Sequence, residues 1–234
     1  MSNSPVWLFD ESNQVGVDYS DRDLAEGYDR QHEGFRDFQE EALKICETLG
    51  LSGDSIVLDI GCGTGGLSVH LAHKFKYVYA VDISEAMINI LRSKISQQGI
   101  KNITPVQSGF LTYEHQGTDL DAIVSNIALH HLPDFWKQIA LCRLHDILKP
   151  GGKLFLVDVV FGFLPREYRT SFEEWLNSMR SLAGPEMAEE AIVHVREEYS
   201  TWDWIMEGML ERAGFCINSK TDIKQNMSAY LCTK

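Results

Sequence analysis

The sequence predicts a doubly wound α/β fold: a seven-stranded, mostly parallel sheet with an antiparallel C-terminal hairpin and a helical cap. Three observations lead to this prediction. Between residues 56 and 161, short apolar runs rich in β-forming residues alternate with helical stretches, which is typical of parallel βαβ units. A glycine-rich turn joins the first run directly to a helix. The last two apolar runs are separated by only three polar residues, so they form antiparallel neighbours.

Length and composition fit one soluble globular domain. The chain has 234 residues, of which 44% are hydrophobic and 24% charged, and is shorter than two domains of about 150 residues. We therefore expect residues 1–234 to form a single domain. The five cysteines are scattered without a C-x-x-C pair, so neither a disulfide framework nor a zinc ribbon is indicated. No signal-peptide pattern and no apolar run of about 20 residues occur, which predicts a cytoplasmic protein without a membrane partner.

Residues 1–50 are predicted to form an N-terminal helical cap segment. The first twenty residues are polar and irregular. From Asp21 onward, apolar residues recur at spacings of three, four or seven, namely Ala25, Tyr28, Phe35, Phe38, Ala42 and Ile45, which is the pattern of an amphipathic helix. Gly50 and the polar turn after it end this helix.

Residues 51–161 are predicted to form the cofactor-binding core of the sheet. The expected strands are Ile56–Ile60, Tyr77–Val81, Ile103–Val106, Ala122–Ser125 and Lys153–Phe161, with helices at Gly65–His73, Ser84–Gln97 and Asp134–Leu148. Residues 201–234 complete the domain with a helix at Thr201–Ala213 and the hairpin Phe215–Ile223 and Met227–Thr233.

Residues 162–200 do not follow this alternation and are too long for a simple loop. One helical face is expected from Phe172, Trp175, Leu176, Met179 and Ala183, and a second helix after Pro185. In an open α/β sheet, a segment inserted after a strand lies beyond that strand's carboxyl end, where ligands bind. We therefore expect the insert to cover the substrate site.

A glycine-rich turn follows the first strand in the stretch Val57–Gly66. Glycines at 61, 63, 65 and 66 permit a tight turn and a close approach of the backbone to a ligand. Asp82 ends the second strand, 23 residues after Asp59, where a carboxylate accepts hydrogen bonds from ribose hydroxyls. Strand, glycines, helix and acid together predict a Rossmann-like nucleoside-cofactor site.

Two cofactor classes fit this motif. Gly61, Gly63 and Gly66 also satisfy the G-x-G-x-x-G pattern of NAD-dependent oxidoreductases. However, Asp59 lies two residues before the first glycine, where its charge suits an ammonium group better than a pyrophosphate. No second dinucleotide half is present, and the one Tyr-x-x-x-Lys match, Tyr230 to Lys234, lies on the terminal strand.

Four segments in order resemble class I S-adenosylmethionine-dependent methyltransferases. They are Asp59–Gly65, Ala80–Ser84 with Met87, Asn126–Asp134, and Leu148–Lys153 before a strand. The resemblance implies S-adenosyl-L-methionine as cofactor, S-adenosyl-L-homocysteine as product, and no metal. It says almost nothing about the acceptor.

The resemblance also implies which residues hold the cofactor. Asp59, Gly61, Cys62, Gly63 and Gly65 would hold its methionine end, Asp82 its ribose, Ile83 and Met87 its adenine, and Asn126 the floor beneath the methyl group. Tyr28 and Tyr19 resemble aromatic residues that close over the cofactor. Where the family usually has an acid that reads the adenine amino group, this chain has Gln107-Ser108-Gly109-Phe110; Gln107, or a backbone group near Gly109 and Phe110, would replace that contact.

Methyl transfer from a sulfonium is an in-line displacement that needs a general base only when the acceptor must lose a proton. His130 follows the fourth strand and His194 lies in the insert, so both are candidate catalytic residues. His131, Glu198, Tyr199 and Trp202 are candidate substrate-binding residues. For His130 and His131, the alternative is a histidine pair that only orients its loop. For the candidates in residues 194–204, the alternative is a solvated helix end with a Ser/Thr cap. His70 and His73 are three residues apart but have no third ligand in range, so no metal site is predicted.

The acceptor is predicted to be a small molecule. The fourth strand lacks the Asn/Asp-Pro-Pro-aromatic motif of enzymes that methylate nucleic-acid amino groups, and no proline precedes a cysteine, as in cytosine-carbon methyltransferases. A net charge of −13 also opposes binding to nucleic acid. The alternative is a non-catalytic regulatory protein that binds the same cofactor. Either would be a monomer or a homodimer.

The negative charge is concentrated in two segments. Residues 1–50 hold 12 acids and four bases, residues 162–204 hold nine acids and four bases, and the remainder is neutral. Two interpretations are open. The charge serves solubility, or it forms an acidic entrance that favours a neutral or cationic acceptor.

Overall fold

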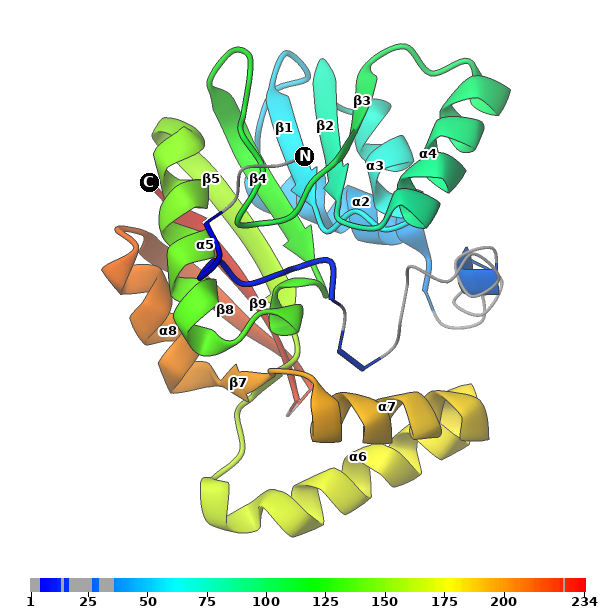
Figure 1. Cartoon of the computed structure of the whole chain (residues 1–234), viewed down its shortest axis with the longest axis vertical. Helices are drawn as coiled ribbons and strands as arrows, with labels where there is room; N and C mark the ends of the chain where they lie inside the picture. The colour runs from blue at the N-terminus through cyan, green and yellow to red at the C-terminus, as the bar shows by residue number, and fades with distance from the viewer. Residues whose placement is uncertain (1–4, 14, 17–26, 30–35, 225) are drawn as a thin grey trace.

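A computed structural model describes residues 5–13, 15–16, 27–29, 36–224 and 226–234. Its main sheet has the strand order β3-β2-β1-β4-β5-β9-β8 (Figure 1). The strands are β1 (Ile56–Ile60), β2 (Tyr77–Asp82), β3 (Ile103–Gln107), β4 (Leu120–Asn126), β5 (Leu148–Asp158), β8 (Cys216–Lys224) and β9 (Met227–Thr233). The first five are parallel, and β9 pairs antiparallel with both β5 and β8. The predicted seven-stranded fold is confirmed.

Helices cover both faces of the sheet, because side chains of a strand alternate between its two faces. On β1, Val57 packs with α2 (Phe38–Leu49), α3 (Gly66–Ala72) and α4 (Glu85–Gln98), whereas Leu58 packs with α5 (Asp134–Ile147) and α8 (Asp203–Arg212). The sheet therefore separates two apolar cores, which hold the strand ends in place.

Capping groups set the limits of the helices beside the first strands. The Asp37 carboxylate accepts the Glu40 amide at the start of α2, and Gly50 ends that helix with φ of 58°. Ser84 accepts the Met87 amide at the start of α4. The single helix predicted from Asp21 to Gly50 is wrong in its continuity: α2 begins at Phe38 because Asp37 is extended, and residues 27–29 form a separate helical turn. Asp21 itself lies outside the described residues.

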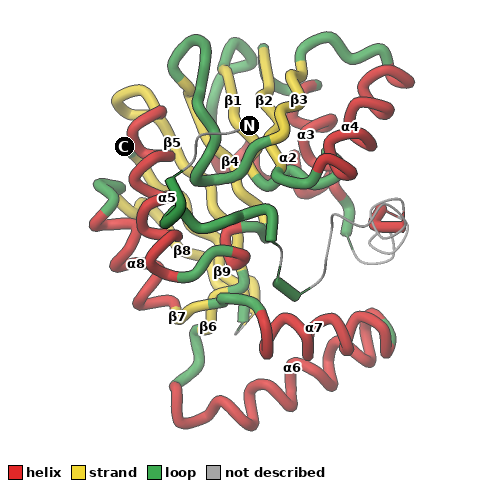
Figure 2. Tube along the Cα trace, in the orientation of Figure 1, coloured by secondary structure: helices red, strands yellow, loops and turns green. Residues whose placement is uncertain are grey.

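The insert forms two helices beyond the carboxyl ends of the parallel strands, as Figures 1 and 2 show. They are α6 (Tyr168–Ala183), after a short 3-10 turn (Pro165–Glu167), and α7 (Pro185–Glu197), with Gly184 between them. The two ends of the insert meet in a second sheet that the sequence did not predict, where β6 (Val160–Phe161) pairs parallel with β7 (Thr201–Trp202). The helix predicted from Thr201 consequently starts at Asp203. In the described part of the chain, no helix is both long and apolar enough to cross a bilayer.

Candidate active site

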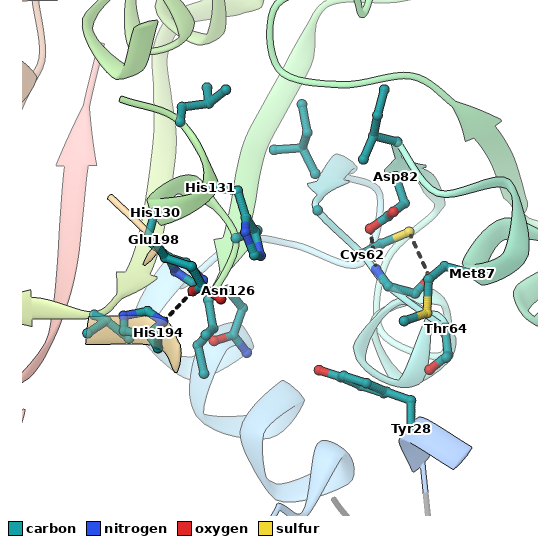
Figure 3. Close-up of a pocket in the computed structure, with 18 of the residues that line it drawn as sticks. Tyr28, Cys62, Thr64, Asp82, Met87, Asn126, His130, His131, His194 and Glu198 are labelled. Carbon is teal, nitrogen blue, oxygen red and sulfur yellow. Dashed lines mark hydrogen bonds and ion pairs between the residues drawn. The ribbon is translucent and has the colours of Figure 1, made fainter. Parts of the chain in front are cut away.

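A cavity of about 280 Å³ lies at the carboxyl ends of the parallel strands. Its lining comes from the loops after β1 to β5, the N-terminal lead-in, α7 and one turn of α6. Figure 3 shows Asp82, Cys62, Met87 and Tyr28 on one side of it, and the histidines with Glu198 and Asn126 on the other. We describe these as the nucleoside end and the histidine end.

The loop after β1 is built from residues with left-handed backbone. Gly61, Gly63 and Gly65 have φ of 74°, 54° and 75°. The amides of Gly61 and Cys62 both donate to the Val81 carbonyl of β2, at 2.8 and 3.0 Å. A Cβ added at Gly63 would meet nothing within 4 Å, whereas one at Gly65 would lie 2.2 Å from Leu91. Gly63 therefore opens toward the cavity, while Gly65 packs against α4 and does not line it.

Two carboxylates flank this loop. Asp82 accepts the Gly63 and Ser84 amides, each at 2.8 Å, and its burial raises its pKa. Asp59 is 1% exposed and accepts the Ser68 hydroxyl at 2.5 Å. Burial, with the nearby charge of Asp82, raises the pKa of Asp59 to about 7. A cationic ligand group here would stabilise the ionised form of Asp59. Burial also raises the pKa of the Cys62 thiol, which makes it an unreactive lining group.

The far part of the nucleoside end contains a carboxylate that the sequence did not indicate. Ile83, Met87, Gly109 and Phe110, which the resemblance assigns to the adenine, line the cavity. Gln107 is exposed and donates instead to the Ile83 carbonyl at 3.4 Å.

Glu11 of the lead-in reaches this loop from 100 residues away and accepts the Leu111 amide at 2.9 Å. A Cβ added at Gly109 would lie 2.4 Å from Glu11 Oε2, so only glycine permits this contact. Burial raises the pKa of Glu11.

Polar contacts link the first helix to the floor of the cavity. Arg36 donates to both oxygens of Glu41 at 3.0 and 2.6 Å, and the Asn126 amide donates to the same carboxylate at 3.1 Å. Ile127 follows with φ of 58°, a left-handed value that no other non-glycine residue has in the described ranges. Tyr28 lines the cavity, while Tyr19 lies outside the described residues.

His130 is the best-oriented group at the histidine end. Its ring is buried, with Nδ1 2.5 Å from Asp158 Oδ1 and Nε2 3.3 Å from Glu198 Oε2. Burial alone would lower its pKa, but the Asp158 carboxylate raises the pKa of His130 above its usual value. Each ring nitrogen lies beside a carboxylate, which favours the doubly protonated imidazolium, so the ring is not a vacant general base in this arrangement.

His131 and His194 complete this end. Burial lowers the pKa of His131 to about 4, and the charge of His130 adds to that effect. The pKa values of the two adjacent histidines are thus shifted in opposite directions, that of His130 upward and that of His131 downward. His194 Nδ1 pairs with Glu198, and its Nε2 lies 2.6 Å from the Ser200 hydroxyl. Burial alone would raise the pKa of Glu198, but His194 and His130 lower it.

The backbone beside Glu198 is held firmly. The Tyr199 amide donates to the His130 carbonyl at 3.0 Å, and the buried Lys137 ammonium donates to the Tyr199 carbonyl and to Asp134. Tyr199 therefore positions the cluster through its backbone. The structure does not place Tyr199 or Trp202 in the cavity lining; Trp202 packs against Phe161 and Phe163, with ring centroids 5.9 and 5.1 Å away.

One family model matches residues 57–152, described as a methyltransferase domain. An uncharacterized methyltransferase of Geobacillus kaustophilus is 28% identical over 195 residues, which cover 82% of this chain and 85% of that protein. These similarities support the assignment of the chain to the class I S-adenosylmethionine-dependent methyltransferases.

Solved structures confirm the fold of this methyltransferase. A SAM-dependent methyltransferase from Aquifex aeolicus superposes with a TM-score of 0.65 at 19% identity, over 91% of this chain and 98% of that one. Magnesium protoporphyrin IX methyltransferase from Synechocystis, solved with bound SAM, has a TM-score of 0.62 at 18% identity, over 98% and 100% of the two chains.

Proposed function

We propose that this methyltransferase transfers the methyl group of S-adenosylmethionine to a small-molecule acceptor bound between the strand ends and α7. The observation that carries the proposal is the shared cavity, whose lining includes Asp59 and Asp82 at one end and His131 and Glu198 at the other. A donor and an acceptor bound at these two ends would meet above Asn126.

The nucleoside end fits the cofactor. Gly63 leaves room beside its backbone, and Asp82 is held by two amides in a position to accept ribose hydroxyls. The buried Asp59 suits the cofactor's ammonium group, because that charge offsets the cost of ionising a buried carboxylate. Ile83 and Met87 would pack on the adenine, with Gly109, Phe110 and Glu11 at its edge.

The histidine end would bind and orient the acceptor. When bound, the cofactor supplies an electrophilic methyl group, and the protein contributes position and exclusion of water. Trp175, Met179, Met187 and Ala191 of the insert give this end apolar walls. His130 and His194 both contact Glu198, so we assign them to orienting that carboxylate toward the acceptor.

Two measurements test the proposal in sequence. Isothermal titration should show binding of S-adenosylhomocysteine and none of NAD(H). The protein should then transfer labelled methyl from S-adenosylmethionine to a component of fractionated cell extract, to be identified by mass. NAD(H) binding without S-adenosylhomocysteine binding would contradict the cofactor assignment. S-adenosylhomocysteine binding with no labelled product in any fraction would indicate a regulatory protein instead.

A further inference from the structure

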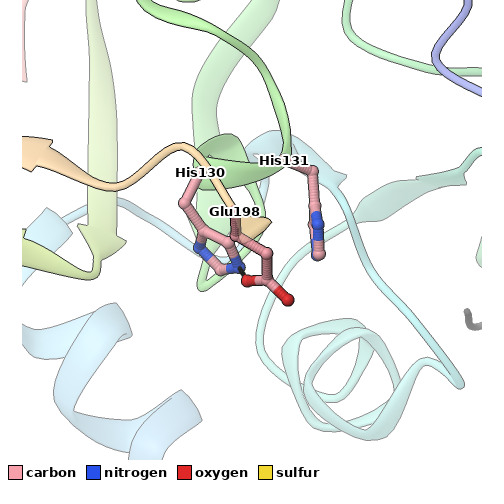
Figure 4. Close-up of side chains that lie close together, drawn as sticks. All are labelled: His130, His131 and Glu198. Atoms are coloured by element: carbon pink, nitrogen blue, oxygen red, sulfur yellow. Dashed lines mark ion pairs between the residues drawn. The ribbon is translucent and has the colours of Figure 1, made fainter. Parts of the chain in front are cut away.

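We propose that His130, His131 and Glu198 bind a divalent transition-metal ion at the histidine end of the cavity. The three side chains converge from two elements, the turn after β4 and the end of α7 (Figure 4). Metal binding can be measured without methyl transfer, so the proposal stands apart from the proposed function.

The spacing of the candidate ligand atoms approaches that of a coordination sphere. One ligand atom from each residue lies within 4.8 Å of the others. His130 Nε2 and Glu198 Oε2 are 3.3 Å apart. With metal–ligand bonds of about 2.0–2.1 Å, neighbouring ligands of a tetrahedral ion lie about 3.3 Å apart. One edge of the site already has this length, and movement of the His131 side chain would have to bring its distances to the other two ligand atoms to the same value.

Asp158 provides the support that a metal-binding histidine normally has. It lies 2.5 Å from His130 Nδ1 and also accepts the His130 and Val159 amides at 3.0 and 2.7 Å. A ligating histidine usually donates its second ring N–H to a carboxylate, which fixes the ring and directs the other nitrogen at the metal. His194 Nδ1 contacts the same Glu198 oxygen, Oε2, as His130 Nε2 does, and so helps to fix that carboxylate.

The local charge is compatible with a dication. Asp158 and Glu198 are two carboxylates with side chains 1% and 4% exposed, in contact with the same imidazole. Removing two negative charges from water is costly unless positive charge accompanies them. The His130 imidazolium and the buried Lys137 ammonium already provide positive charge beside Asp158. A dication in place of the proton on His130 Nε2 would raise that positive charge by one unit, and the displaced proton would pass to solvent.

Two imidazoles and one carboxylate are a known ligand set for Zn²⁺ and for Fe²⁺, and both sites keep open positions. All three ligands line the cavity, so the open position would face it and take a water or an oxygen of the acceptor. That last role alone rests on the proposed function.

Zinc titration of the full chain tests the site. Protein stripped with EDTA is titrated with Zn²⁺ against a chromophoric chelator, and one Zn²⁺ per chain is expected. His131→Gln and Glu198→Gln should abolish stoichiometric binding. Asp158→Asn should weaken it about 10- to 100-fold, the usual effect of losing such a support. His73→Gln is the matched control, because His73 belongs to a histidine pair on α3 that lacks a third ligand among the described residues.

Three results would overturn the proposal: binding well below one ion per chain, binding unchanged in His131→Gln and Glu198→Gln, or binding lost in His73→Gln. Circular dichroism of each variant shows whether it is folded. His194→Gln is a second test of the site: it leaves all three ligands in place, so it should weaken Zn²⁺ binding without abolishing it. Titration of the wild type with S-adenosylhomocysteine, with and without Zn²⁺, measures cofactor binding independently of metal binding.

Discussion

The Asp82 carboxylate can fix the glycine loop and also bind the ligand. Two of its acceptor positions take the amides of Gly63 and Ser84, so the side chain fixes the glycine loop against the start of α4. A carboxylate has about four lone-pair positions. The remaining ones are available for the ribose.

Replacing Asp82 tests this assignment. Asp82→Ala should weaken S-adenosylhomocysteine binding about 10- to 150-fold, since a hydrogen bond to a charged group contributes about 1.5–3 kcal/mol. Glu85→Ala, an exposed residue three positions later, should leave affinity unchanged. Isothermal titration measures both, and an equal affinity in Asp82→Ala and wild type would remove Asp82 from the ribose site.

Asp59 predicts a pH dependence of cofactor binding. Its pKa of about 7 in the free protein means that it is largely protonated below that pH. The cofactor's ammonium favours the ionised form, so binding releases a proton, and affinity should rise up to about tenfold per pH unit below pH 7 and then level off. Titration with S-adenosylhomocysteine from about pH 5.5 to 8.5 measures this slope. In Asp59→Asn the slope should disappear, and an identical slope in that variant would assign the proton to another group.

Residues of the site differ in how well the sequence reveals them. Asp59 and Gly63 lie in one local motif and Asp82 ends the next strand, so the adjacent strand ends bring them together in any fold of this topology. Glu11, Asp158 and Arg36 carry no local signal, because their roles depend on contacts across the fold, such as Glu11 with Leu111. Asp158 is the last residue of β5, and its position beside the end of β4 was the one signal that could have identified it.

In the glycine loop, a residue with left-handed backbone also lies where the ligand would approach the backbone. Gly63 and Gly99 both have left-handed backbone, with φ of 54° and 66°, and a Cβ at either would meet no atom within 4 Å. Gly99 ends α4 and does not line the cavity. The two glycines therefore carry the same backbone strain in different places.

Alanine substitution of Gly63 and of Gly99 distinguishes the effect of backbone strain on stability from the effect of ligand contact on affinity. Gly63→Ala and Gly99→Ala should each lower the free energy of unfolding by about 1–2 kcal/mol, the cost of a left-handed L-residue. Only Gly63→Ala should also lose S-adenosylhomocysteine affinity. Denaturant unfolding and isothermal titration give the two readings. Equal affinities in the two variants would show that Gly63 does not approach the cofactor.

Lys137 connects α5 to the end of the insert. It is fully buried and donates to Asp134 and to the Tyr199 carbonyl. Lys137→Met should lower the free energy of unfolding by about 1.5–3 kcal/mol, because charged hydrogen bonds are lost, and the melting temperature by about 3–12 °C. Lys101→Met, at an exposed position, serves as control in the same thermal scans. A Lys137 variant as stable as the control would show that this contact does not hold the insert.

Helices and strands were predictable where the hydrophobic periodicity and the turn residues at the ends of a segment indicate the same element. The core strands lie within a few residues of their predicted ranges because buried parallel strands read as short apolar runs. The β6–β7 pair was not predictable, since two residues per strand leave no periodicity. The strained Ile127 was not predictable either, because its φ of 58° is imposed by the surrounding fold and opposes its own preference.

The distribution of charge belongs to the whole molecule. The neutral part of the chain forms the sheet and most of the helices that cover it, whereas the net charge of −13 lies in residues 1–50 and 162–204. The described parts of both segments border the cavity, through Glu11, Tyr28 and Arg36 on one side and α7 on the other. A cavity bordered by acidic segments attracts cations and repels anions over about 10 Å at 0.1 M salt.

Acceptor charge should therefore govern turnover at low salt. Labelled methyl is expected in neutral and cationic fractions of cell extract rather than in anionic ones, and added salt should reduce turnover of a cationic acceptor because it screens the attraction. The double variant Glu173→Gln and Glu174→Gln removes two exposed charges of α6 and should reduce this salt dependence. Equal turnover of anionic and cationic acceptors at low salt would assign the charge to solubility alone.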